Sequence, residues 1–457
     1  MTEQSRRAFL RRSAALGIVG SATPFVVNFA AIGEAAAATA TDYKALVCIF
    51  MFGGNDYANT VTPFDQPTYD QYARLRSTIA HSRDSIAATA LTPQNALPGG
   101  AQFALAPGLA PLVPLFDSGR LAVALNVGTL VQPTSKANYL ARSVLLPPKL
   151  FSHNDQQSFW QASNAEGASS GWGGRIGDLL QSGNGSSTLT CINASGNAVF
   201  MSGRSAVQYS VTANGPVPLL NNSTTLFGSS VGMSTLRTLM TQPREHVLEA
   251  EHNRVTKRSL DLQLQVSGAL AAAPALNTVF PVGNTLADQL RIVARLISVS
   301  QELGARRQVF FVSMGGFDNH DSMLTTHPVL LARVGAAMRA FHDATVELGV
   351  VDKVTSFTAS DFGRTLTSNA NGSDHGWGSH HFVMGGAVRG RAFYGTPPVV
   401  ADNGPDDVGQ GRLLPSLSVD QYGATLASWF GVPSGSLTTV LPNLANYNPS
   451  TWNVGFM

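Results

Sequence analysis

The amino-acid sequence predicts an α/β fold, in which a mostly parallel sheet has helices on both faces. Short, continuous apolar runs are each bounded by glycine or polar residues, which is typical of strands buried on both faces of a sheet. Helical patterns, in which apolar residues recur every three or four positions, lie between several of these runs. Alternating strands and helices favour a parallel sheet, because each helix carries the chain back along the sheet.

These elements follow one another along most of the chain. The expected strands span residues 45–52, 121–127, 309–314 and 354–359. Helices are expected at residues 285–303, 329–348 and 419–430, and long helices within residues 234–270. A Ser-, Asn- and Gly-rich segment at residues 184–230 predicts short strands and loops. We expect one large domain over residues 41–457, in which residues 184–283 form an insertion or a cap.

The first 40 residues predict an export signal. Residues 5–10, SRRAFL, match a twin-arginine signal, an apolar stretch follows, and residues 38–40 resemble a cleavage site. An uncleaved membrane anchor is the alternative, but Pro24 and Asn28 make this stretch a poor membrane span. We therefore expect a periplasmic or secreted protein that meets the twin-arginine translocase during export and has no stable transmembrane span.

The charge of the mature chain disfavours nucleic acid as a partner. Residues 1–40 hold four Arg and two acidic residues, so 26 basic and 26 acidic side chains remain after their removal. A net charge of zero leaves no basic excess to bind phosphate backbones. Of the two cysteines, Cys48 lies within an apolar strand run, so we expect a buried free thiol there rather than a disulfide with Cys191.

Acidic residues follow three of the expected strands. Asp56, Asp318 and Asp361 each come a few residues after a strand. Since ligands of parallel sheets bind at the carboxyl ends of strands, we expect the three carboxylates to share one site. His320 lies two positions after Asp318, a spacing that puts both side chains on one face of an extended loop. Alternatively, Asp318 is solvated, His320 belongs to a turn, and Asp361 caps the next segment.

Six of the ten histidines lie between residues 318 and 381. The densest run is residues 374–381, DHGWGSHH, in which three imidazoles can surround an ion. A surface loop with a chance histidine pair is the alternative. We expect at least one of these histidines to act as an acid, a base or a partner of a ligand.

Ser152 and Arg364 are the candidate catalytic residues. A metal ion can activate the Ser152 hydroxyl as a nucleophile. Ser152 can equally cap a helix, and both roles are compatible because a helix N-terminus favours anions. Arg364 can pair with Asp361 or bind an anionic substrate through two parallel hydrogen bonds.

The predicted site thus contains a divalent metal ion, which can be zinc, manganese or iron. The candidate ligands are carboxylates and imidazoles, namely Asp56, Asp318, His320, Asp361, His375 and His380. The residues expected to hold the ligands in place are His153, Asp374 and His381.

Six runs carry a resemblance to a known family: residues 52–56, 151–156, 171–175, 315–320 and 360–364, and residues 374–378 with 385–386. In their order along the chain, these six runs resemble those of a large family of twin-arginine-exported bacterial proteins. That family is labelled domain of unknown function 1501 and is placed in the alkaline phosphatase/sulfatase superfamily.

The resemblance implies an alkaline phosphatase/sulfatase-like fold and hydrolysis of phosphate or sulfate esters, or of related anionic substrates that are small or linked to a polymer. Asp56 resembles the superfamily's metal-binding Asp after the first strand, and Ser152 its nucleophile at a helix start. Where the superfamily has an Asp-His pair, this chain has Asp361 and Phe362. The missing ligand would then come from elsewhere, for example His375.

Two classes of function therefore remain. One is an exported metal-dependent hydrolase of anionic esters. The other is an exported binding or envelope protein, without catalysis, on a degenerate hydrolase fold. A redox metalloprotein is disfavoured, because two scattered cysteines offer few thiolate ligands.

Overall fold

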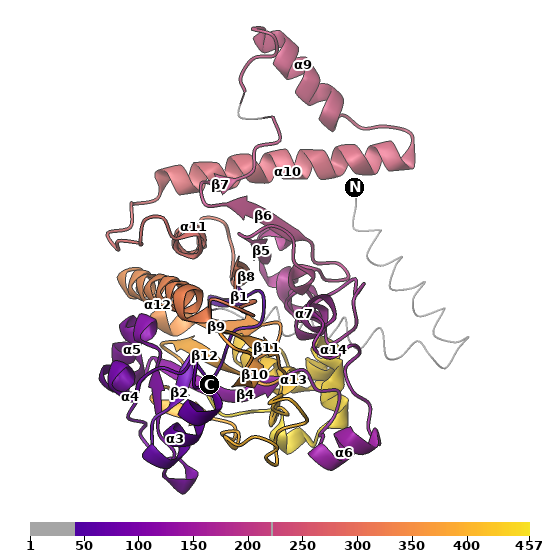
Figure 1. Cartoon of the computed structure of the whole chain (residues 1–457). Helices are drawn as coiled ribbons and strands as arrows, with labels where there is room; N and C mark the ends of the chain where they lie inside the picture. The colour runs from indigo at the N-terminus through magenta and orange to yellow at the C-terminus, as the bar shows by residue number, and fades with distance from the viewer. Residues whose placement is uncertain (1–41, 221–222) are drawn as a thin grey trace, which may run out of the picture.

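A ten-stranded sheet forms the centre of the protein (Figure 1). The computed structural model describes residues 42–220 and 223–457, so the predicted export signal lies outside the described residues. The strand order is β13-β4-β12-β9-β1-β8-β5-β6-β7, with β14 beside β4. The strands are β1 (Lys44–Met51), β4 (Leu121–Gly128), β5 (Cys191–Asn193), β6 (Gln208–Thr212), β7 (Gly215–Pro216), β8 (Arg307–Met314), β9 (Val354–Ser360), β12 (Ser379–Gly385), β13 (Ala392–Tyr394) and β14 (Leu417–Ser418).

Most neighbouring strands of this sheet run parallel. β1 lies between β8 and β9 and is parallel to both. β12 runs antiparallel between β4 and β9, and β7 runs antiparallel to β6. Two small antiparallel sheets complete the strands: β2 (Val61–Pro63) with β3 (Phe103–Leu105), and β10 (Arg364–Ser368) with β11 (Ser373–His375). The predicted mostly parallel α/β fold is confirmed.

Helices cover both faces of the sheet because its central strands are apolar on both faces. In β1, Val47 and Ile49 belong to one buried cluster, and Cys48 and Phe50 belong to another. The first cluster includes α5 (Val113–Asp117), α11 (Thr285–Ser298), α12 (Met323–Glu347) and the end of α10 (Val247–Ala272). The second includes α7 (His153–Ala162), α8 (Trp172–Leu180), α13 (Val419–Phe430) and α14 (Leu437–Val440).

The other helices lie outside these two layers. They are α3 (Gln66–Leu75), α4 (Arg83–Ile86), α6 (Lys136–Ala141) and α9 (Ser230–Thr241). Within the segment at residues 184–283, β5 pairs with β8 and extends the main sheet, while α9 and α10 lie at the end of the molecule beyond β7 (Figure 1). The division of the chain into a domain and an insertion stays a prediction.

Cys48 and Cys191 are both buried free thiols, as expected for Cys48 from its apolar strand. Burial raises the pKa of the Cys191 thiol to about 12. Across the described ranges, every helix is too short or too polar to cross a membrane.

A buried aspartate links α7 to the C-terminal segment. Asp420 Oδ1, in the first turn of α13, accepts hydrogen bonds from the Ser163 hydroxyl at 3.1 Å and the Asn443 amide at 3.2 Å. Ser163 is the left-handed C-cap residue of α7. Burial raises the pKa of Asp420 to about 6. This carboxyl group therefore helps to place α7, whose first residue belongs to the candidate site.

We expect Asp420 to make the protein less stable as the pH rises from about 4 to about 6. The unfolded carboxyl group ionises at the ordinary pKa of 3.8, so the folded state holds the extra proton in this window. Between pH 4.5 and 7 the loss amounts to about 2 kcal/mol. Asp420→Asn should remove this part of the pH dependence of denaturant unfolding, whereas the exposed Asp84→Asn should keep it. Identical pH profiles for Asp420→Asn and the unmodified protein would contradict this expectation.

Candidate metal centre

Three loops meet at the carboxyl edge of the sheet because two glycines allow their close approach. Gly53 has φ +115°, and a Cβ atom there would lie 2.4 Å from the backbone nitrogen of Asp318. Gly54 has φ +81°, and its Cβ would lie 2.4 Å from the Phe362 ring. Side chains are disfavoured at these φ values, and both sites lack space for one. The loops after β1, β8 and β9 are thereby in direct contact.

Three imidazoles converge on the carboxylate of Asp318 in this region. Asp318 Oδ1 lies 3.0 Å from His320 Nε2 and 3.3 Å from His375 Nε2. Asp318 Oδ2 lies 3.5 Å from His153 Nε2. The Nε2 atoms of His320 and His375 are 2.9 Å apart. These side chains come from the loop after β8, from β11 and from the start of α7, so the site joins distant parts of the chain.

Each of these imidazoles is held at its other nitrogen. The acceptors at Nδ1 are Asp361 Oδ2 for His153 at 2.7 Å, Asp374 Oδ1 for His320 at 2.9 Å, and the Phe151 carbonyl for His375 at 2.7 Å. An acceptor at Nδ1 places the hydrogen there and leaves the lone pair on Nε2. This arrangement is typical of metal-binding histidines, which donate Nδ1–H to a carboxylate or carbonyl.

When the three imidazoles are neutral and carry their hydrogen on Nδ1, their Nε2 lone pairs repel one another and the Asp318 carboxylate. Three Nε2 lone pairs that face one carboxylate bring negative potential together, and a divalent ion reverses this interaction. His153, Asp318 and His375 each offer one ligand atom, and these atoms lie within 4.8 Å of one another. The buried Nε2 of His153 has no hydrogen-bond partner among the described residues. The donor set therefore suits a divalent metal ion.

The ionisation of these side chains follows from their neighbours. The hydrogen bond to Asp361 raises the pKa of His153, and burial lowers the pKa of His375. Burial alone would raise the pKa of Asp318, but the hydrogen bond and charge of Arg364 outweigh it and lower that pKa. Asp318 is thus ionised, as a metal ligand must be.

Asp361 contacts a ligand histidine through one oxygen. Besides His153, its Oδ2 accepts hydrogen bonds from Gln157 Nε2 at 2.8 Å and from the Gly53 amide at 3.2 Å. The side chain is fully buried, and Oδ1 has no partner in the described part of the chain. Asp361 therefore orients His153 through its Oδ2 atom.

Arg364 is fully buried, and its guanidinium group donates several hydrogen bonds. Its Nη1 donates to Asp318 Oδ1 at 2.9 Å and to the Gly53 carbonyl at 3.0 Å, and its Nε donates to the Ser373 carbonyl at 2.9 Å. Of the two roles considered for it, pairing with a carboxylate is the one that the geometry favours, although the partner is Asp318 rather than Asp361.

Ser152 is the N-cap residue of α7, directly before His153. Its hydroxyl makes no capping bond to the backbone and instead donates to Asp155 Oδ2 at 2.9 Å. Asp155 is buried and lies 3.6 Å from the Lys149 ammonium group. Ser152 is therefore at a helix start with a carboxylate as its hydrogen-bond acceptor.

Three of the predicted site residues have their partners elsewhere. The buried Asp56 carboxylate bonds to Arg76 at 2.5 Å and to the Ser373 hydroxyl at 2.6 Å. His380 Nδ1 accepts from the Asn126 amide at 3.0 Å. The ring of His381 packs edge-on against Trp160. Burial lowers the pKa of both histidines to about 3, so they are neutral.

The structure also adds contacts that the sequence did not predict. Gln157 lies four positions after His153, on the same side of α7, and shares its contact with Asp361. The Phe362 ring packs against both His153 and His375, with centroid distances of 4.9 and 4.8 Å, and these two imidazoles are themselves 4.3 Å apart. The helical spacing within SHNDQQ was the available signal for Gln157, whereas the sequence marked Phe362 only as a departure from the superfamily pattern.

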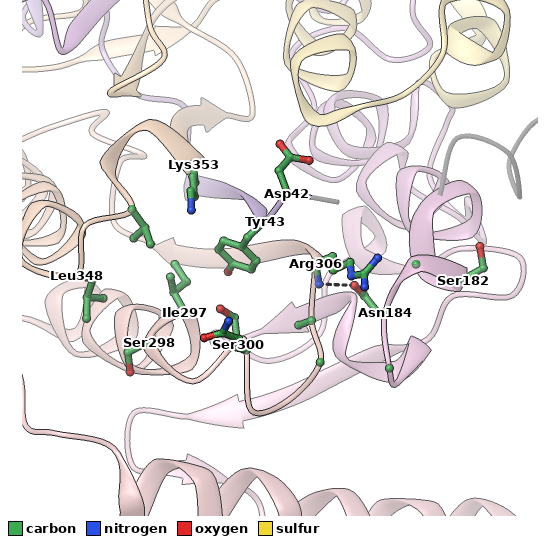
Figure 2. A pocket seen from close by; sticks show the side chains of 16 residues that line it. Asp42, Tyr43, Ser182, Asn184, Ile297, Ser298, Ser300, Arg306, Leu348 and Lys353 are labelled. Atoms are coloured by element: carbon green, nitrogen blue, oxygen red, sulfur yellow. Dashed lines mark hydrogen bonds between the residues drawn. The ribbon is translucent and has the colours of Figure 1, made fainter. Parts of the chain in front are cut away.

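A separate pocket of about 930 Å³ lies at the opposite end of the strands, where β1 and β8 begin (Figure 2). Asp42, Tyr43 and Asn184 are among its lining residues. Their polar groups bond within the fold, since Tyr43 donates to Gln308 and Asn184 accepts from the Arg306 amide. This pocket is distinct from the metal centre, which lies where β1 and β8 end.

Residues 43–414 match the family described as "Protein of unknown function (DUF1501)". The chain belongs to this family, and the family prediction is confirmed. A search of curated proteins finds no match.

Several solved structures match most of the chain at low identity. Ps i-CgsB in complex with k-i-k-neocarrahexaose is 10% identical, with 90% of this chain and 78% of that chain covered and a TM-score of 0.36. A structure concerned with the metabolism of multiple glycosaminoglycans by Bacteroides thetaiotaomicron is 9% identical, with coverages of 85% and 73% and a TM-score of 0.34. The PsFucS1 sulfatase from Pseudoalteromonas sp. is 8% identical, with coverages of 89% and 72% and a TM-score of 0.31. With scores this low, we take the fold from the strand order itself.

Asp56 and Asp318 should respond differently to the same substitution. Asp56→Asn leaves the fully buried Arg76 without its counter-charge, which should cost about 3–5 kcal/mol of stability in denaturant unfolding. Asp318→Asn also removes the carboxylate partner of the buried Arg364, but the Asp318 side chain is 45% exposed and solvent screens this pair. The loss of stability should therefore be smaller than for Asp56→Asn, while metal content should fall. Metal analysis of the folded variants checks this. A folded Asp56→Asn variant without metal would instead make Asp56 a ligand.

Proposed function

We propose that this protein is an exported metal-dependent hydrolase of phosphate or sulfate esters or related anionic substrates. The observation that carries the proposal is the convergence of three Nε2 atoms on Asp318, with every Nδ1 occupied by an acceptor. Export rests on the twin-arginine motif in residues 5–10, which places the protein in the periplasm or outside the cell.

His153, His320, His375 and Asp318 would hold the ion. Nitrogen and carboxylate ligands suit zinc, manganese and iron. When bound, such an ion polarises an ester oxygen and lowers the pKa of an oxygen nucleophile. The protein contributes the orientation of the ligands: Asp361 holds Nδ1–H of His153, and Arg364 fixes Asp318.

Ser152 is the proposed nucleophile. Its Oγ–H donates to Asp155 Oδ2, which would accept the proton as Oγ forms a bond to the phosphorus or sulfur atom and the ester bond to the departing alcohol breaks. The N-terminus of α7 begins at the next residue, and its free amides favour an anion there. The alternative role of this hydroxyl is structural, as a hydrogen-bond donor to Asp155 in the first turn of α7, and kinetics separates the two roles.

Metal analysis tests the proposal most directly. Protein purified without chelators should contain near-stoichiometric zinc, manganese or iron, and His153→Ala and Asp318→Ala should lose the ion and the hydrolysis of a panel of phosphate, phosphonate and sulfate esters. His252→Ala, at an exposed position of α10, is the matched control and should keep both. An Asp318→Ala variant with full activity on a responsive ester would refute the mechanism.

Substitution of Ser152 separates catalysis from a structural role. If Ser152 is the nucleophile, Ser152→Ala should lower kcat by about a thousandfold or more while metal content stays unchanged. If its hydroxyl only donates a hydrogen bond to Asp155, kcat should stay constant and stability should fall by about 1 kcal/mol. Steady-state kinetics and denaturant unfolding of the same preparation distinguish these outcomes.

The alternative function is a non-catalytic exported binding or envelope protein on a degenerate hydrolase fold. The observation that favours it is Phe362, an aromatic ring at the position where the superfamily resemblance implies a ligand histidine. Protein that lacks metal and keeps its full thermal stability in chelator would support this alternative.

A further inference from the structure

Arg412 lies beside the proposed metal centre with part of its guanidinium group unpaired. Its Nε donates to the carbonyl of His375 at 3.1 Å. Its Cζ lies 4.4 Å from the ring centroid of Phe151, whose carbonyl accepts the Nδ1–H of His375. Arg412 is half-buried, and in the described part of the chain Nη1 and Nη2 have no hydrogen-bond partner.

The backbone that carries Arg412 is held rigidly. Gly411 has φ +74°, and a Cβ there would lie 2.8 Å from the amide of Thr367. Buried Asp407 accepts hydrogen bonds from the amides of Gly409 at 2.8 Å and Gly411 at 3.0 Å. The guanidinium group is therefore ordered before any ligand arrives, which lowers the entropic cost of binding.

The other two cations near the centre are already paired. Arg364 is fully buried and donates to Asp318 and two carbonyl groups. The Lys149 ammonium group lies 3.6 Å from Asp155, and its side chain is 70% exposed. Among the three, Arg412 alone has a planar pair of N–H groups free to form two parallel bonds to an oxyanion.

We propose that Arg412, stacked on Phe151, binds the anionic oxygen atoms of the substrate beside the metal centre. The ligand class is a tetrahedral oxyanion, either phosphate or sulfate, and the inference rests on the proposed function. Nη1 and Nη2 donate to two oxygens of the anion, while Nε stays bonded to His375. Arg412 thereby takes the substrate-binding role that the sequence suggested for Arg364.

Calorimetric titration of the metal-loaded protein with inorganic phosphate and inorganic sulfate tests this inference. Arg412→Gln should weaken binding of the preferred anion by about tenfold to a hundredfold, since charge-assisted hydrogen bonds are lost. Metal content and Tm should stay constant. Arg83→Gln is the matched control, because Arg83 also lies 4.4 Å over a phenylalanine ring and donates Nε to the carbonyl of that residue, Phe64.

The outcomes separate this inference from the proposed function. If the unmodified, metal-loaded protein binds neither anion, the proposed function fails and the inference fails with it. If it binds one anion and Arg412→Gln binds it equally well, only the inference is overturned. Loss of metal in Arg412→Gln would also overturn it, since Arg412 would then serve to position His375. Should Arg412→Gln not fold, Arg412→Lys keeps the charge and must still weaken anion binding several-fold.

Discussion

The arrangement of hydrogen bonds at the three histidine Nδ1 atoms is the constraint on which the candidate site depends. Asp361, Asp374 and the Phe151 carbonyl fix the outer side of each imidazole, so the inner nitrogens are left to face Asp318. A buried polar atom without a partner is costly, and the Nε2 atom of His153 is one among the described residues. A cation at this point would offset that cost by binding the Nε2 atom and the Asp318 carboxylate.

The sequence predicted that the candidate site lies at the carboxyl ends of the strands, but it predicted only some of the residues that meet there. Asp318, Asp361 and His375 were recognised because each lies just beyond a buried apolar strand or within a glycine-rich histidine run. His153 was considered as a possible ligand but placed among the residues that hold the ligands, because its run is also typical of an ordinary helix start. Its inner position depends on Asp361, which is 208 residues away. A contact between residues this far apart in the sequence cannot be predicted from a local sequence pattern.

Asp56 shows why spacing after a strand is insufficient evidence for a ligand. It follows β1 as Asp318 follows β8, yet its carboxylate pairs with Arg76, a residue of the segment after α3. Burial would raise the pKa of Asp56, but the charge of Arg76 outweighs this and lowers it. Both carboxylates pair with a buried arginine, but that of Asp318 also meets three imidazoles. Only these tertiary partners distinguish the two aspartates.

Phe362 stands where the superfamily resemblance implies a histidine, and its side chain packs within the candidate centre. Its ring packs against His153 and His375 and lies against Gly54, where even a Cβ atom would be too close. A histidine there would offer a further candidate ligand, whereas the phenylalanine packs against two imidazoles supplied by α7 and β11. Since close packing limits the orientations of neighbouring rings, Phe362 helps to orient two candidate ligands from distant parts of the chain and offers no ligand atom itself.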